Sequence, residues 1–279
     1  RYPEVAELGA ALPEGTAIDG EILPWRDGVP LAFAQLQRRI GRKTVSKTIL
    51  AEVPVIFMAF DLIEHQGLDV RPQPLEWRRR RLEELAEAIG FPARDRLILS
   101  PKVNAATWAD LAEERESSRA RHAEGLMLKR LGSPYRVGRQ RGDWWKWKVD
   151  PLTIDAVLIY AQRGSGKRAS LYTDYTFGVW HDGQLVPIAK AYSGLTDDEI
   201  LQVDAFVRKN MVEKFGPVRT VKPALVFELA FEGIHRSSRH KSGIAVRFPR
   251  ILRWRTDKPI EQADTLERVR ELLPDPGRS

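Results

Sequence analysis

Residues 143–151 read Asp-Trp-Trp-Lys-Trp-Lys-Val-Asp-Pro, which joins an alternating, charged strand pattern to a break in the chain. Side chains of a strand point alternately to its two faces, so Lys146 and Lys148 share one face and Trp147 lies on the other. Charges on a half-buried strand are costly unless they are paired or bound to a ligand. The two ammonium groups therefore predict an anion between them, and a triphosphate fits. The alternative is a set of ordinary salt-bridged strand residues.

The composition changes at Asp150-Pro151, and we place a boundary there between two domains, 1–149 and 150–279. The first domain mixes strands with amphipathic helices, whereas the second has short strands at regular spacing and one helix. Such a series of short strands predicts a small β-barrel. The expected strands are 16–25, 53–63, 125–129, 154–161, 170–180, 184–192, 225–232 and 244–254, and the expected helices are 31–40, 74–89, 105–122 and 197–214.

Composition narrows the class of protein. The 279 residues suffice for two domains of ordinary size, and 43% of them are hydrophobic. The absence of cysteine excludes disulfides and cysteine-bound zinc, while a hard metal held by carboxylates and phosphates remains open. The net charge of +7 favours polyanionic partners. No apolar run of about 18 residues is present, so we expect no membrane span.

Two carboxylates also stand inside apolar strand patterns. Glu21 follows Asp19-Gly20 among isoleucine and leucine residues, and Glu124 opens the segment Glu-Gly-Leu-Met-Leu-Lys. Either one alone is consistent with an ordinary salt-bridged strand residue. Together with the paired lysines of residues 143–151 they form a set suited to holding phosphate and its metal ion.

The order of these segments resembles that of the ATP-dependent DNA ligases, within the covalent nucleotidyltransferase superfamily. The tryptophan-rich segment Trp145–Lys148 resembles that of a bacterial subgroup of these ligases. The resemblance implies an α+β fold, with a nucleotidyltransferase domain (ATP-grasp-like, antiparallel sheets with flanking helices) followed by an OB-fold barrel. The segments that carry it are Asp19-Gly20-Glu21, Ala59–Leu62, Glu124–Lys129, Trp145–Lys148 and Arg247–Lys258.

The resemblance implies roles for residues of the first domain. Glu21 would hydrogen-bond the ribose of AMP, and Phe60 would stack on adenine. Glu124, with Glu21, would bind the metal ion, Mg²⁺ or Mn²⁺, or its waters. Lys146 and Lys148 would hold the α-phosphate of ATP and stabilise the charge that develops there.

The second domain would supply Arg247, Asp257 and Lys258 to orient the leaving pyrophosphate when that domain closes. Without the resemblance, the arginines of 247–258 would be a solvated or DNA-facing stripe.

Two departures from the family pattern stand out. The nucleophile motif Lys-x-Asp-Gly is absent from residues 1–279, and because the chain opens at Arg1 on a helix-like segment, we expect the nucleophile to lie upstream. An arginine that the family commonly has before the segment Trp145–Lys148 is Gln140 here, so Arg139 or Arg141 would have to supply its nucleotide contact.

The resulting hypothesis is an enzyme that forms lysyl-AMP from ATP, transfers AMP to a 5′-phosphate and seals nicks in duplex DNA during repair, replication or recombination. We expect a cytoplasmic, nucleoid-associated monomer, and leave open a further N-terminal DNA-binding domain. Two alternatives remain, an RNA ligase or capping-type nucleotidyltransferase, and a non-catalytic DNA-binding fragment.

Overall fold

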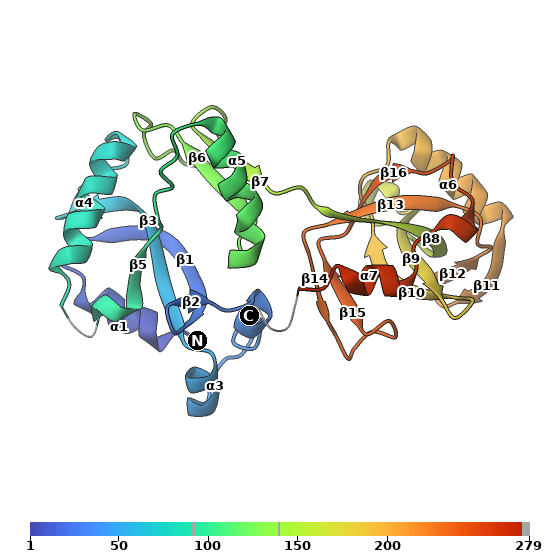
Figure 1. Ribbon diagram of the computed structural model, residues 1–279, viewed down its shortest axis with the longest axis horizontal. Helices are drawn as coiled ribbons and strands as arrows, with labels where there is room; N and C mark the ends of the chain where they lie inside the picture. Colours follow the sequence, from blue (N-terminus) through green and yellow to red (C-terminus); the bar gives the residue numbers. More distant parts are fainter. Residues whose placement is uncertain (91–92, 139, 275–279) are drawn as a thin grey trace. The chain divides into compact units, whose positions relative to one another are not determined.

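The computed structural model describes residues 1–90, 93–138 and 140–274, and the chain divides into two compact units, Arg1–Val149 and Asp150–Ser279 (Figure 1). We refer to them as unit 1 and unit 2. None of the helices within the described ranges is long and apolar enough to cross a membrane.

The centre of unit 1 is an antiparallel pair of long strands, β1 (Ala17–Arg26) and β3 (Val55–His65). Their β-branched and aromatic side chains favour extended backbone, and the strands predicted at 16–25 and 53–63 are confirmed. Three short strands extend the sheet, of which only the last is parallel to its neighbour β3: β2 (Val29–Pro30), β4 (Leu68–Asp69) and β5 (Leu97–Leu99).

Helix α4 (Leu75–Ala88) covers one face of this sheet, as Figure 1 shows. Leu82 and Leu85 share one face of the helix and pack with Ala59 and Leu62 of β3 in the core of unit 1. The helix predicted at 74–89 is therefore confirmed. The remaining helices of unit 1 are α1 (Pro3–Ala11), α2 (Phe33–Gln37), α3 (Lys47–Glu52) and α5 (Trp108–Ser117), with short 3-10 turns at Ala93–Arg96 and Ser118–Arg121.

The helix predicted at 105–122 is shorter than expected. Its start is fixed at Thr107, whose side chain accepts a hydrogen bond from the Asp110 backbone while Asp110 bonds back to the Thr107 backbone. Its regular part ends at Ser117, and a 3-10 turn leads to His122 in the left-handed conformation. This turn brings the chain directly to Glu124.

A second, two-stranded antiparallel sheet in unit 1 joins β6 (Gly125–Lys129) to β7 (Trp144–Lys148). The register places Gly125 opposite Lys148 and Met127 opposite Lys146. Residues directly opposite each other point to the same face of a sheet. The start of β6 and the end of β7 therefore lie side by side.

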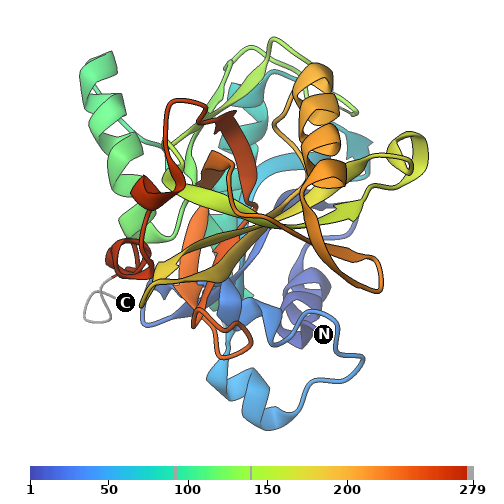
Figure 2. The same cartoon turned by 90° about the vertical axis from the view of Figure 1, so that its right-hand side faces the viewer.

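Unit 2 is built on a curled sheet. Strand β8 (Leu152–Arg163) pairs with β9 (Tyr172–His181) on one side and with β13 (Val226–Phe231) on the other. Strand β10 (Gln184–Ala191) pairs with the other edge of β9, and β16 (Arg250–Trp254) pairs with the other edge of β13. The Ile251 amide of β16 donates to the Ser193 carbonyl just after β10, so five strands close into a ring. In Figure 2 the strands of this unit cross obliquely, as in a small barrel.

Two predictions in unit 2 are wrong in part. The expected helix 197–214 ends early, as α6 (Asp197–Lys209), and its last residues belong to β11 (Met211–Phe215), which forms a hairpin with β12 (Val218–Val221). Gly216, with a φ of 53°, makes the turn. The apolar face of α6 ends at Val207.

The expected strand 244–254 is two strands. Phe248 adopts a φ of 54° and Pro249 follows, which breaks the extended backbone. Strand β15 (Ile244–Arg247) pairs with β14 (Gly233–Arg236), whereas β16 belongs to the barrel. A 3-10 turn at Ile260–Gln262 and helix α7 (Leu266–Glu271) follow.

Candidate nucleotide-binding site

Gly20 allows the close approach of β1 and β3 at the first candidate segment. A Cβ atom at this position would lie 2.4 Å from the Met58 carbonyl oxygen and 2.6 Å from the Phe57 ring. Only glycine fits without moving the neighbouring strand. The next residue, Glu21, is exposed opposite Met58, so its carboxylate is free of the core.

Phe60 occupies an irregular position of β3. Asp19 pairs with Asp61 and Gly20 pairs with Ala59, which leaves Phe60 as the extra residue of a β-bulge. Bulges redirect a side chain from the regular alternation and occur often beside functional sites. Here the Phe60 ring meets the edge of the Trp144 ring of β7, with 6.2 Å between centroids. The adenine-stacking candidate thus lies next to the strand that carries the two lysines.

Three polar contacts, two of them buried, hold this region in place. Asp61 and Arg78 form an ion pair with both side chains fully buried, at 2.7 Å between Oδ1 and Nε. Arg78 also donates to the Ser133 carbonyl at 3.0 Å. The Tyr135 hydroxyl donates to Asp19 Oδ2 at 2.7 Å, and this hydrogen bond is the main reason that the pKa of Tyr135 rises to about 12.

Glu124 and Lys148 meet where β6 begins and β7 ends. The Lys148 Nζ lies 3.0 Å from Glu124 Oε2, and both side chains are about two-fifths exposed. Gly125 makes this approach possible: its φ is +133°, and a Cβ atom would lie 2.2 Å from the Trp147 carbonyl oxygen. The structure therefore brings together the metal-binding candidate and one phosphate-binding candidate predicted from separate segments.

The two faces of β7 have different surroundings. Trp147 faces α5, where its ring meets the Trp108 ring at 5.9 Å and lies under the Arg115 guanidinium at 5.2 Å. Trp144, Lys146 and Lys148 share the opposite face, which contacts Phe60 at Trp144. The alternation predicted for this strand is confirmed. The half-burial expected of the lysines is wrong, because both are exposed.

No role was predicted for Lys129, a charged residue of this site. Its Nζ lies 4.3 Å from the centroid of the Phe60 ring and 3.9 Å from that of Trp144. Burial lowers the pKa of Lys129 to about 8, against the opposing pull of Asp61 and Asp19. The available signal in the sequence was a lysine at the end of the apolar strand pattern Gly125–Lys129.

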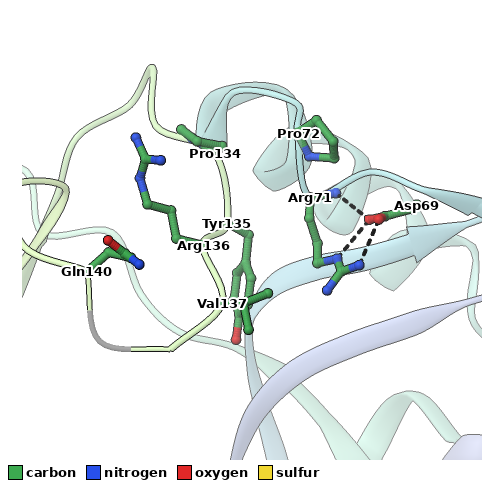
Figure 3. A pocket seen from close by; sticks show the side chains of 8 residues that line it. All are labelled: Asp69, Arg71, Pro72, Pro134, Tyr135, Arg136, Val137 and Gln140. Carbon is green, nitrogen blue, oxygen red and sulfur yellow. Dashed lines mark hydrogen bonds and ion pairs between the residues drawn. The ribbon is translucent and has the colours of Figure 1, made fainter.

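A pocket of about 390 Å³ lies at the edge of unit 1, where Arg71 bonds Asp69 and the Tyr135 side chain forms one wall (Figure 3). Gln140 lines it, on the loop that Figure 3 shows facing Arg71. Arg141, on the same loop, is exposed, and Arg139 lies outside the described residues. The pocket contains none of the phosphate or metal candidates, so we do not place the nucleotide there.

The candidates in unit 2 lie in a network of charges. Arg247 ends β15 with its guanidinium over the Phe248 ring, 4.9 Å from the centroid. Asp257 accepts hydrogen bonds from Nε and Nη2 of Arg255, which lowers the pKa of Asp257 to about 2. Lys258 donates from Nζ to Asp155 Oδ2 at 2.6 Å. Asp257 and Lys258 therefore have partners within their own unit.

The donor set suits a magnesium ion bound mainly by substrate. Within the described part of the chain, no three histidine or acidic side chains converge on one point. Mg²⁺ is commonly held by one or two carboxylates together with phosphates and water. Glu124 beside Lys148 fits such a site, and Glu21 remains a predicted second ligand.

Unit 1 is a mixed α and β unit that carries the nucleotide-site candidates on paired strands, and unit 2 is a five-stranded barrel. These two units define the class of two-domain nucleotidyltransferases with an OB-fold. The model of the ATP dependent DNA ligase domain matches residues 2–148, and that of the ATP dependent DNA ligase C terminal region matches residues 168–258. The chain belongs to the ATP-dependent DNA ligase family.

Relatives agree with this assignment. A probable DNA ligase of Koribacter versatilis is 39% identical over 97% of this chain and 50% of its own length. A probable DNA ligase of Opitutus terrae is 40% identical over 98% of this chain and 29% of its own. The chain thus spans half or less of these relatives. A solved Lig E DNA ligase has the same fold, with a TM-score of 0.63 and 21% identity over 90% of this chain and 80% of that one. The predicted α+β fold class is confirmed.

Proposed function

We propose that this chain supplies part of the catalytic core of an ATP-dependent DNA ligase. The enzyme joins a lysine amine to the α-phosphorus of ATP with loss of pyrophosphate, transfers AMP to the 5′-phosphate of a nick, and releases AMP when the 3′-hydroxyl attacks that phosphate. Family membership and the relatives named above support this proposal.

The observation that carries the proposal is the shared surface of β3, β6 and β7. Phe60 lies beside Trp144, and Lys146 and Lys148 follow on the same face of β7. An adenine stacked on Phe60 would direct its phosphates along this row of ammonium groups. Fixed cations at that point stabilise the negative charge of the transition state in every phosphoryl-transfer step.

Glu124 has a second role in the proposal. Its carboxylate holds the Lys148 ammonium at 3.0 Å. It would also hold Mg²⁺, which supplies Lewis-acid stabilisation of the phosphate charge when bound. Because carboxylate and ammonium are adjacent, the metal and lysine contacts would converge on the same phosphate group.

The leaving pyrophosphate is assigned to unit 2. Arg247, Asp257 and Lys258 would act when pyrophosphate is present, that is, in the first step only. Residues 1–279 contain no Lys-x-Asp-Gly segment, so the proposal places the nucleophile in another part of the protein.

The test is to incubate the full-length protein with ATP labelled at the α-phosphate, and then to supply nicked duplex DNA. We expect covalent label on the protein and its loss when the nick is sealed. Parallel nicks with RNA on either side separate DNA ligation from RNA ligation. A full-length protein that forms no covalent adenylate under these conditions would refute the proposal.

A further inference from the structure

Asp155 is a buried carboxylate with unequal surroundings at its two oxygens. It stands on β8 within an apolar run, and its side chain is 11% exposed. Oδ2 accepts from Lys258 Nζ at 2.6 Å and from Arg255 Nη1 at 2.9 Å. Oδ1 is buried and has no hydrogen-bond partner among the described residues. A carboxylate kept only for stability would be expected to use both oxygens.

The backbone of Asp155 is fixed independently of these cations. Its amide donates to Asp264 Oδ2 at 2.8 Å, and the Asp264 amide donates to the Asp155 carbonyl at 2.8 Å. Arg255 is likewise held without Asp155, because it makes a two-point contact with Asp257. Lys258 is therefore the cation whose position depends most on Asp155.

We propose that Asp155 is a positioning residue that holds the Lys258 ammonium ready for the leaving pyrophosphate. This inference rests on the pyrophosphate role proposed for Lys258. An ammonium group has three donors and no acceptor, and Asp155 uses one of them. Among the described residues the Lys258 ammonium makes no second hydrogen bond and its side chain is 21% exposed, so the other two donors can serve an anion. The carboxylate thus removes the rotamer freedom of a long side chain before the anion binds.

The first experiment is a double-mutant cycle in the full-length protein. Asp155→Asn keeps the shape of the side chain but removes its charge, and we expect the adenylylation rate to fall about tenfold because the ammonium is no longer held in place. The sealing of a pre-adenylylated nick should change little. In a Lys258→Ala background the Asp155→Asn change should have no further effect on adenylylation, because residues that act through one group are not additive. Equal factors in both backgrounds would show that Asp155 acts only through the fold, and would overturn the proposal.

A matched control is Asp174→Asn. Asp174 also stands on a strand of unit 2 and pairs with a lysine, Lys190, at 3.0 Å. Among the described residues, it makes no hydrogen bond or ion pair with residues 247–258. We expect this variant to adenylylate at the wild-type rate. An equal loss in both variants would mean that any broken lysine pair in the unit has the same effect, and would also overturn the proposal.

A second arm does not need enzyme activity. The affinity of residues 1–279 for inorganic pyrophosphate is measured by calorimetry, and Asp155→Asn and Lys258→Ala should weaken it by similar factors. A full-length protein that forms no adenylate, while its pyrophosphate affinity depends on both residues, would refute the proposed function and leave this inference standing. Normal adenylylation and pyrophosphate binding in Asp155→Asn would refute the inference alone, and a wild-type chain that binds no pyrophosphate would also refute it.

Discussion

Replacing Arg78 by methionine should destabilise unit 1 strongly. Arg78 is fully buried and makes two hydrogen bonds to Asp61, at 2.7 and 2.9 Å, besides those to the Gln73 and Ser133 carbonyls. Methionine fills similar space but donates none of these bonds. It leaves Asp61 charged, buried and without its guanidinium partner. Removing one member of a buried ion pair typically costs about 3–5 kcal/mol.

The assay is thermal and urea unfolding, followed by tryptophan fluorescence. A loss of that size corresponds to a fall in melting temperature of about 10 °C for a domain of this length. The matched control is Arg80→Met on the same helix. The Arg80 side chain is 65% exposed, and its guanidinium lies as far as 3.9 Å from the Glu76 carboxylate, so this ion pair is loose. That variant should change the unfolding free energy by less than about 0.5 kcal/mol.

A third variant separates the charge effect from the loss of packing. Asp61→Leu combined with Arg78→Met replaces the pair by apolar groups, and should recover part of the stability that Arg78→Met alone loses. An Arg78→Met protein whose unfolding free energy lies within about 1 kcal/mol of the wild-type value would refute the reasoning, since burying an unpaired carboxylate destabilises a protein by more than that.

Four further substitutions test the candidate site in the full-length protein. Gly125→Ala should destabilise the protein by more than about 1 kcal/mol in urea unfolding, because β7 leaves no room for a Cβ atom, whereas Gly132→Ala, with nothing within 4 Å, should be neutral. Lys146→Ala should slow both adenylylation and the sealing of a pre-adenylylated nick by about a hundredfold, and Glu124→Ala should abolish sealing; wild-type rates in rapid-quench assays would contradict either role. Asp257→Ala should slow adenylylation more than sealing, and equal losses in both would contradict a role confined to pyrophosphate.

Periodicity predicted the regular elements well and missed features that depend on single residues. The apolar face of α4 and the alternation of β7 are local patterns, and both are present in the structure. The break at Phe248 and the hairpin turn at Gly216 arise from positive φ at one residue each. Periodicity does not mark such a position, so the pattern of 244–254 predicts one strand through Phe248. The helix predicted at 197–214 is too long for a different reason, because α6 already ends at Lys209 and Gly216 lies beyond the predicted range.

The site shows the same limit. Sequence order separated Glu124 from Lys148, and only the register of the β6–β7 hairpin places them 3.0 Å apart. The pairing of Asp61 with Arg78 joins a strand to a helix, and no periodicity encodes a polar contact between two elements. Asp155 did carry a signal, because it is a charge within the apolar run of β8, but its partner Lys258 lies 103 residues later in the chain.

The pH dependence of stability tests the position of Lys129. Burial lowers the pKa of this lysine from 10.5 to about 8 in the folded protein. Between pH 8 and pH 10.5, the unfolded chain therefore still binds a proton that the folded protein has released. The free energy of unfolding increases with pH across that range. Below pH 8 Lys129 is protonated in both states, and its buried charge destabilises the folded protein by the full amount. Lys129→Met removes it, so the variant should be more stable than wild type near pH 7, by about 1–2 kcal/mol after allowing for partial solvent exposure. That advantage should shrink as the pH approaches 10.5. The measurement is urea unfolding of both proteins from pH 6 to 10, and a constant difference would show that the ammonium between Phe60 and Trp144 is as well solvated as an exposed one.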